Sequence, residues 1–179
     1  KSLLCVKEND TFMDFICRQV LHVREQYKQS VKFMVMNSFS TSEDTKEFLD
    51  KNYPELAKNY AEEVEVLQNK VPKILLDDLT PASYEKDPEC EWVPPGHGDF
   101  YAALLGTGKL DKLLAEGYKY MFVSNSDNLA ATLDLKLLTE FANKDHDFMI
   151  EFAERTEIDM KGSHLGQFKA GGYLVRELN

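Results

Sequence analysis

Short apolar runs alternate with amphipathic helical segments along this chain, and this alternation constrains the fold more than any other feature. Runs such as 31–36 and 120–123 are bounded by polar residues, as is typical of strands buried on both faces. The segments between such runs place apolar residues at helical spacing. We therefore predict an α/β fold, with a largely parallel mixed sheet covered by helices on both faces. The expected strands are 31–36, 64–67, 120–123 and 148–152, the expected helices are 11–28, 41–53, 100–105, 109–116 and 132–142, and the tail from 161 is ambiguous, with a hairpin as one reading.

Polar turns follow three of the expected strands. They are Asn37-Ser38, Gln68-Asn69 and Asn125-Ser126-Asp127. In parallel sheets, ligands bind beyond the carboxyl ends of the strands. The pattern therefore predicts a ligand site where these turns converge.

The charge balance and the length of the apolar runs argue against nucleic-acid-binding and membrane-spanning proteins. The chain has 179 residues and a net charge of −10, with a pI of about 4.9. A general nucleic-acid-binding face is not expected on so acidic a protein. No apolar run approaches the length of a membrane span, so we expect no membrane partner.

Cysteine usage and the chain ends suggest a cytoplasmic piece of a longer protein. Cys5, Cys17 and Cys90 fit neither a zinc spacing nor a disulfide framework, so we expect reduced thiols in a cytoplasmic protein. The chain begins at Lys1 without a methionine and stops directly after a strand-like run at 173–175. We expect that both ends were cut from something longer or trimmed.

Asp127 is the first candidate for chemistry. It follows an expected buried strand and lies between Asn125 and Asn128. Mg²⁺ prefers one or two carboxylates together with phosphate oxygens and water. Asp and Asn also commonly cap the start of a helix. The sequence leaves metal binding and helix capping open as alternatives.

The segment Pro94-Pro95-Gly96-His97-Gly98-Asp99 is more unusual. Two prolines stiffen it, while glycines on both sides of His97 allow backbone N–H groups to approach a ligand. Its position before an expected helix favours a ligand site, in which the backbone reads a base edge and His97 donates to a phosphate. The alternative is a tight turn whose glycines supply only a positive φ.

Weaker candidates lie elsewhere in the chain. Gln68 carries an amide that can pair with a base, and Lys1 and Lys161 can neutralise phosphate charge. Taken alone, each is more typical of a solvated surface residue. The chain contains no Walker-type phosphate loop, no Rossmann glycine fingerprint, no zinc-protease motif and no serine-hydrolase elbow.

Several motifs together resemble the UTP–glucose-1-phosphate uridylyltransferase family, also called UDP-glucose pyrophosphorylase. The likeness runs across nearly all of the chain. It rests on Lys1-Ser2, Met36-Asn37-Ser38-Phe39 with Asp44-Thr45, Pro94-Pro95-Gly96-His97-Gly98-Asp99, Phe122-Val123-Ser124-Asn125-Ser126-Asp127-Asn128-Leu129 and Asp159-Met160-Lys161-Gly162. The tail, 161–165 followed by 174–177, looks closer to bacterial members than to animal ones.

The resemblance implies a fold and a reaction. Residues 1–179 would form a single, truncated nucleotidyltransferase catalytic domain with a Rossmann-like sheet. UTP and glucose 1-phosphate would give UDP-glucose and pyrophosphate with Mg²⁺ as cofactor, by in-line attack without a covalent intermediate. Catalysis would then consist of positioning and charge stabilisation.

The resemblance also implies a role for each matching residue. Lys1 would contact the nucleotide phosphates and act with Asp127, the Mg²⁺ ligand, in catalysis. Gln68 and the backbone of Gly96 would read uracil, and His97 would contact the sugar-phosphate side. The substrate site would be lined by Asn125, Ser126 and Asp127.

Some family features are different or missing here. The glycine-rich nucleotide loop upstream of Lys1 and the C-terminal β-helix region are absent, and Ala130 and Ser163 stand where the family usually has glycine. Two alternatives follow: a catalytically inactive fragment that binds uridine nucleotides, or a pyrophosphorylase of broad UDP-sugar specificity. The sequence does not indicate an oligomeric state.

Overall fold

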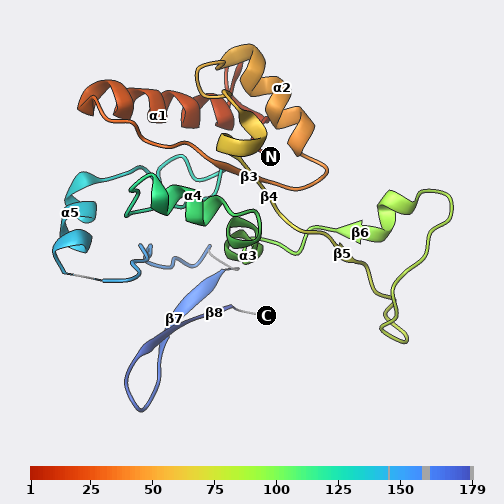
Figure 1. The fold of residues 1–179 in the computed structure, drawn as a ribbon. Helices are drawn as coiled ribbons and strands as arrows, with labels where there is room; N and C mark the ends of the chain where they lie inside the picture. Colours follow the sequence, from red (N-terminus) through yellow and green to blue (C-terminus); the bar gives the residue numbers. More distant parts are fainter. Residues whose placement is uncertain (145, 159–161, 178–179) are drawn as a thin grey trace. The chain divides into compact units, whose positions relative to one another are not determined.

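The computed structural model describes residues 1–144, 146–158 and 162–177. These residues form two compact units, Lys1–Leu133 and Asp134–Asn179. The first unit contains β1 (Cys5–Lys7), β2 (Asp10–Thr11), α1 (Phe12–Tyr27), β3 (Val35–Asn37), α2 (Ser42–Asn52), the π-helix η1 (Tyr60–Val64), β4 (Glu65–Leu67), β5 (Val71–Pro72), the 3₁₀ helix η2 (Pro88–Glu91), β6 (Trp92–Val93), α3 (Asp99–Gly106) and α4 (Lys109–Ala115) (Figure 1). The second unit contains α5 (Leu135–Asn143), β7 (Ser163–Gln167) and β8 (Tyr173–Glu177).

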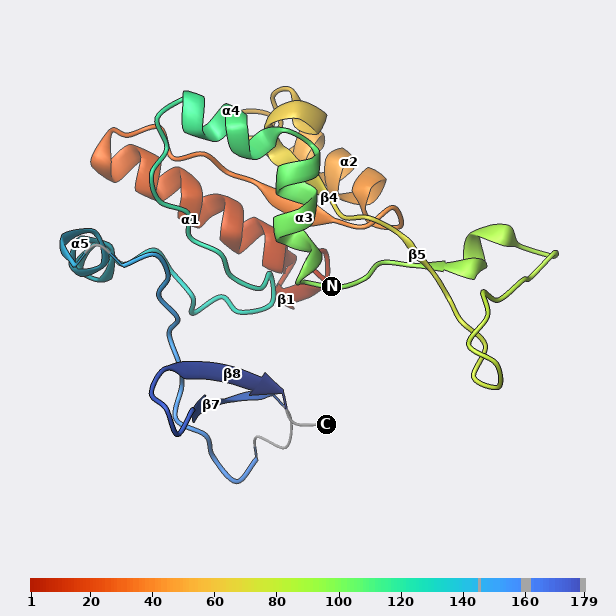
Figure 2. The ribbon, with the colours of Figure 1, turned by 60° about the horizontal axis from the view of Figure 1, so that its bottom comes forward.

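The helices lie close to their predicted positions, because the residues that start and end a helix are local signals. Thr11 caps α1 by accepting from the backbone N–H of Asp14, whose carboxylate accepts in return from the backbone N–H of Thr11. Gly108 separates α3 from α4 with a φ of +72°, a conformation that favours glycine. The two helices therefore follow one another as separate elements (Figure 2).

The central feature of the first unit is the parallel pair β3–β4, in which Val35, Met36 and Asn37 lie opposite Glu65, Val66 and Leu67. Side chains of β3 point alternately to two cores. Val35 packs against the core formed by α1, α2 and η1, whereas Met34 and Met36 pack against the core formed by Val66, α3 and α4. The first core comprises Met13, Cys17, Phe33, Leu49, Tyr53, Leu56, Ala57, Tyr60 and Val64.

The predicted large parallel sheet is not present among the residues that the structure describes, which form a mixed α/β arrangement with small sheets. The described strands form four two-stranded sheets, β1–β2, β3–β4, β5–β6 and β7–β8. Only β3–β4 is parallel among them. The predicted strands 120–123 and 148–152 are therefore wrong, whereas the hairpin reading of the tail is confirmed.

The physical reason lies in strand pairing. A strand requires a hydrogen-bonded neighbour, which an apolar run by itself cannot supply. Side chains in both runs remain about half exposed: Phe122 and Val123 are 50% and 61% exposed, and Met149 is 42% exposed. The prediction of burial for these two runs is therefore wrong as well, because no described strand pairs with either of them.

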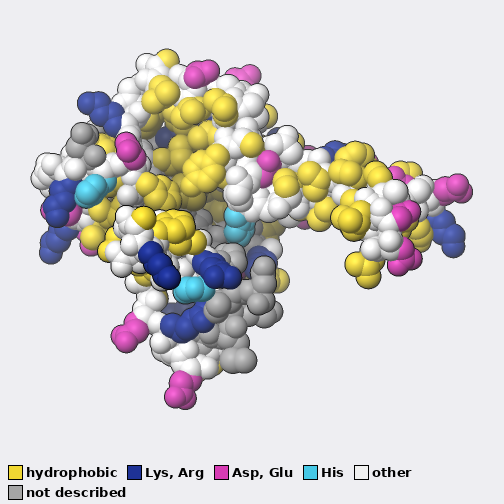
Figure 3. Space-filling model, turned by 90° about the horizontal axis from the view of Figure 1, so that it is seen from below, with side chains coloured by type: hydrophobic (Ala, Val, Ile, Leu, Met, Phe, Trp, Pro, Cys, Tyr) yellow, Lys and Arg dark blue, Asp and Glu magenta, His cyan; other side chains and the backbone are white. Residues whose placement is uncertain are grey.

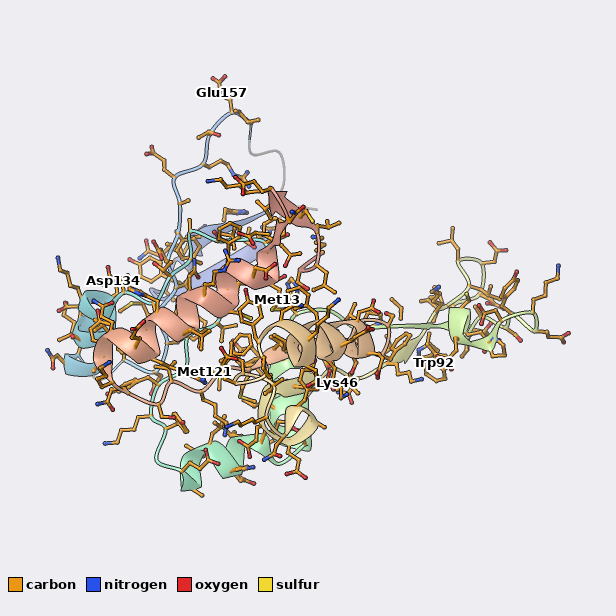
Figure 4. All side chains as sticks on the ribbon, turned by 90° about the horizontal axis from the view of Figure 1, so that it is seen from above. Met13, Lys46, Trp92, Met121, Asp134 and Glu157 are labelled. Carbon is orange, nitrogen blue, oxygen red and sulfur yellow. The ribbon has the colours of Figure 1, made fainter. Side chains whose placement is uncertain are left out.

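A long excursion of chain, residues 70–93, carries β5 and β6 away from α1, α2, α3 and α4 of the first unit (Figure 1). Hydrophobic side chains are exposed along it (Figure 3), including Ile74, Leu76 and Leu79. Trp92 lies on this excursion, whereas Met13 belongs to α1 and is buried in the first core (Figure 4). Within the described ranges, no helix combines the length and apolarity needed to cross a membrane.

Leu49 tests the first core. Its side chain is fully buried, so Leu49→Ala removes packed methyl groups and leaves a cavity. We expect the free energy of unfolding to fall by about 2–5 kcal/mol, measured by urea unfolding followed by circular dichroism. The matched control is Leu76→Ala, because Leu76 is 91% exposed. Equal effects of the two substitutions would contradict this assignment of the core.

Candidate functional site

Gln68 lies immediately after β4, where the chain leaves the parallel pair. Its backbone N–H donates to the carbonyl of Asn37 at 2.9 Å, which continues the β3–β4 ladder by one bond. Asn37 is buried, and its side chain donates to Tyr60 and Glu65. The position of Gln68 is therefore fixed by backbone bonding to a buried residue.

The loop at 94–98 brings a backbone donor to the Gln68 side chain. The N–H of Gly96 donates to Gln68 Oε1 at 3.3 Å. Gly96 has a φ of +110°, which disfavours any residue with a side chain although open space surrounds it. This bond orients the Gln68 amide with its oxygen toward the loop.

Two turn bonds shape the same loop at the start of α3. The backbone N–H of Asp99 donates to the carbonyl of Gly96, and that of Phe100 donates to the carbonyl of His97, both at 3.1 Å. The side chain of Asp99 accepts from the backbone N–H of Asn69 at 2.6 Å. The start of α3 is therefore joined to the chain that follows β4 at a second point, beside the Gly96–Gln68 bond.

Asp127 lies in the predicted polar turn, which a bond from the Asn128 N–H to the Asn125 carbonyl closes at 3.1 Å. Ser126 lies in the same turn and is partly buried. The turn is held against α1, because Gln19 donates its side-chain amide to the carbonyl of Leu129 at 3.1 Å. Thus Asn125, Ser126 and Asp127 lie together in one anchored turn.

Lys1 and Asp127 form an ion pair although they are distant in sequence. Lys1 Nζ donates to Asp127 Oδ2 at 3.3 Å, and the Asp127 side chain is 41% exposed. The ammonium of Lys1, with a weaker contribution from His97, holds the pKa of Asp127 below its usual range. Asp127 is therefore ionised at neutral pH and open to solvent.

A cation would have to share Asp127 with other ligands. Nowhere in residues 1–144, 146–158 and 162–177 do three or more His, Cys, Asp or Glu side chains meet in a metal-binding group. Mg²⁺ commonly uses one carboxylate and takes its other ligands from phosphates and water. The ionised, exposed carboxylate of Asp127 fits that mode of binding.

The structure thus groups the predicted site residues into two pairs, Gln68 with Gly96 and Lys1 with Asp127. His97 lies in the loop with Gly96 and acts electrostatically on Asp127. Lys161, the second candidate phosphate lysine, lies outside the described residues.

Sequence reasoning missed the contact between Asn69 and Asp99. In the sequence, Asn69 stands out only as part of a polar turn, and Asp99 only as the last residue of the segment 94–99. The available signal was that Asn69 directly follows Gln68 and that Asp99 closes the segment that contains Gly96 and His97. Their mutual contact joins residues 30 apart, so local patterns could not reveal it.

The chain is similar to known proteins over almost its whole length. A family model described as UTP–glucose-1-phosphate uridylyltransferase matches residues 1–178. The uridylyltransferase of Saccharomyces cerevisiae is 39% identical over 92% of this chain and 32% of its own length. The chain therefore spans about a third of the length of this curated relative.

Solved structures give a closer match. A crystal structure described as UDP-glucose phosphorylase from Trypanosoma brucei aligns with a TM-score of 0.91 and 50% identity, over 99% of this chain and 39% of that one. A Leishmania major UDP-glucose pyrophosphorylase variant, solved with UDP-glucose, aligns with a TM-score of 0.90 and 46% identity over the same shares.

The expected bacterial character of the tail is not borne out. The similar proteins named above come from a yeast and two trypanosomatids, all of them eukaryotes. Short glycine-rich tail motifs are too few in residues to outweigh similarity along the whole chain.

The Lys1–Asp127 pair predicts a measurable change in acidity. Lys1→Ala removes the donor that stabilises the ionised carboxylate, so we expect the pKa of Asp127 to rise toward its usual 3.8. In the wild type, the pair persists at neutral pH and is lost as pH falls through the lowered pKa. Carboxyl ¹³C NMR titration of Asp127 measures this directly. Lys46→Ala, which removes an ammonium paired with Asp50 instead, is the control; an unchanged Asp127 pKa in Lys1→Ala would contradict the pairing.

Proposed function

The chain belongs to the UTP–glucose-1-phosphate uridylyltransferase family, and on that premise we propose that the full-length protein makes UDP-glucose and pyrophosphate from UTP and glucose 1-phosphate. An oxygen of the sugar phosphate attacks the α-phosphorus of UTP. The bond from that phosphorus to the α–β bridging oxygen breaks, and pyrophosphate leaves with the electron pair. No covalent enzyme intermediate is needed, so the protein's task is to position reactants and stabilise charge.

The observation that carries this proposal is the pairing of Gly96 N–H with Gln68 Oε1. A donor next to an acceptor complements the edge of uracil at which the C4 carbonyl oxygen adjoins the N3–H. In cytosine the corresponding positions are an amino group and an unprotonated nitrogen, so both contacts would be mismatched for a base held in one place. The two groups satisfy each other at 3.3 Å in this structure and can exchange that bond for a uracil edge.

The remaining site residues act on the phosphates and the sugar. Lys1 contacts the nucleotide phosphates, and Asp127 holds Mg²⁺, which offsets the negative charge of the phosphates when bound. His97 contacts the sugar-phosphate side, and Asn125 and Ser126 line the substrate site beside Asp127. The ion pair between Lys1 and Asp127 supports this division, because it puts the phosphate-binding cation beside the metal-binding carboxylate.

We also propose a cytoplasmic location for the protein. Cys5, Cys17 and Cys90 are free thiols, which suits a reducing compartment.

Asp127→Asn tests the metal assignment in the full-length protein. Asn keeps the size and shape of the side chain but loses the charge that binds Mg²⁺, so we expect kcat to fall about 100-fold while circular dichroism stays unchanged. The measurement is a coupled assay of UDP-glucose formation at several Mg²⁺ concentrations. Asp111→Asn, at an exposed position on α4, is the matched control. Near-normal turnover in Asp127→Asn would contradict the role of this carboxylate.

The same assay separates the alternatives. Turnover by the full-length protein, with UTP binding but no turnover by the 179-residue chain, would assign this chain the binding function alone. Comparable rates with galactose 1-phosphate and glucose 1-phosphate would indicate broad UDP-sugar specificity.

A further inference from the structure

The carboxylate of Asp99 makes an unusually complete contact with a single residue. Oδ2 accepts from the backbone N–H of Asn69 at 2.6 Å and from its side-chain amide at 3.1 Å, while Oδ1 accepts from the same amide at 2.9 Å. Charge-assisted hydrogen bonds of this kind are stronger than neutral ones. Asp99 therefore clamps Asn69 through both its backbone and its side chain.

This clamp is not explained by helix capping. Asp99 lies in the first turn of α3, where a carboxylate is favoured by the helix dipole. Its oxygens nevertheless accept from Asn69, which lies 30 residues earlier in the chain. The contact serves the junction between the loop and β4.

Asp99, Asn69, Gln68 and Gly96 are linked in a closed series of bonds that includes both proposed uracil-reading groups. Asn69 follows Gln68 in the chain, and Asp99 binds Asn69. The backbone N–H of Asp99 donates to the carbonyl of Gly96, whose own N–H donates to Gln68 Oε1. Movement of Asp99 would therefore change the spacing between the Gly96 donor and the Gln68 acceptor.

We propose that Asp99 is a positioning residue for base selection, which holds Gly96 N–H and Gln68 Oε1 at the spacing of a uracil edge. The inference rests on the proposed function and adds to it a determinant of specificity that does not itself touch the base. Small displacements of binding groups are costly, since hydrogen bonds weaken steeply with misalignment.

The test compares nucleotide selection in variants of the full-length protein. Calorimetry measures the dissociation constants of UTP and, by competition, CTP. Asp99→Ala removes every carboxylate contact to Asn69, so we expect the preference for UTP over CTP to fall about tenfold. The KM for glucose 1-phosphate should change by a smaller factor, because only His97 of its proposed contacts lies in the loop that Asp99 holds, whereas Asn125 and Ser126 lie in another turn.

Two further variants give a graded series. Asn69→Ala keeps the backbone N–H that donates to Asp99 and loses only the side-chain bonds, so its loss of selectivity should be smaller. Asp99→Asn keeps one oxygen acceptor but replaces the other with an amide NH₂ group, which cannot accept from Asn69. Its preference for UTP over CTP should lie between those of the wild type and Asp99→Ala. Asp111→Ala, at an exposed position on α4, is the control.

The outcomes separate this inference from the proposed function. A wild-type protein that binds CTP as tightly as UTP would count against the proposed function itself. A selective wild type whose preference is unchanged in Asp99→Ala would overturn only the role of Asp99. If Asp99→Ala fails to fold, Asn69→Ala decides the question by the same ratio.

Discussion

The structure around the site depends on the buried side chain of Asn37. Its amide nitrogen donates to Tyr60 Oη at 2.7 Å and to Glu65 Oε1 at 2.8 Å, while its amide oxygen accepts from Thr45 at 3.0 Å. One side chain therefore joins the end of β3 to α2, η1 and β4. Loss of it would remove one hydrogen bond from each of the buried side chains of Tyr60, Glu65 and Thr45, which is costly in a low-dielectric interior. The backbone carbonyl of Asn37 also accepts from the backbone N–H of Gln68, so the same residue holds the start of the candidate site.

This arrangement supports a functional site whose binding groups are mostly exposed. The Asn37 side chain is buried and its amide is fully hydrogen-bonded. Gln68 and Gly96 are only partly buried, so a ligand can reach them. Burial, followed by the nearby Glu65 carboxylate, raises the pKa of Tyr60, so the phenol stays protonated as a hydrogen-bond donor. A rigid interior that presents a donor and an acceptor at its surface is suited to reading a base edge.

Local features of the fold were predictable from sequence, and non-local ones were not. The helices at 12–27, 99–106 and 109–115 match expectation because periodicity and end signals lie within each segment. The large parallel sheet was wrong because strand pairing depends on residues far apart, and 120–123 has strand composition without belonging to a described strand. Similarly, Gln68 and Gly96 were predicted as candidates from their motifs, but their bond to each other and the Asp99 clamp required the folded chain.

The central claim is that Gly96 N–H and Gln68 Oε1 exchange their mutual bond for the edge of uracil. The most direct measurement is the amide NMR spectrum of the full-length protein during titration with UTP and, separately, with CTP. The predicted result is a saturable shift of the Gly96 backbone amide and the Gln68 side-chain amide with UTP, and little change with CTP at the same concentration. Saturable UTP binding that leaves both resonances unmoved would contradict the claim.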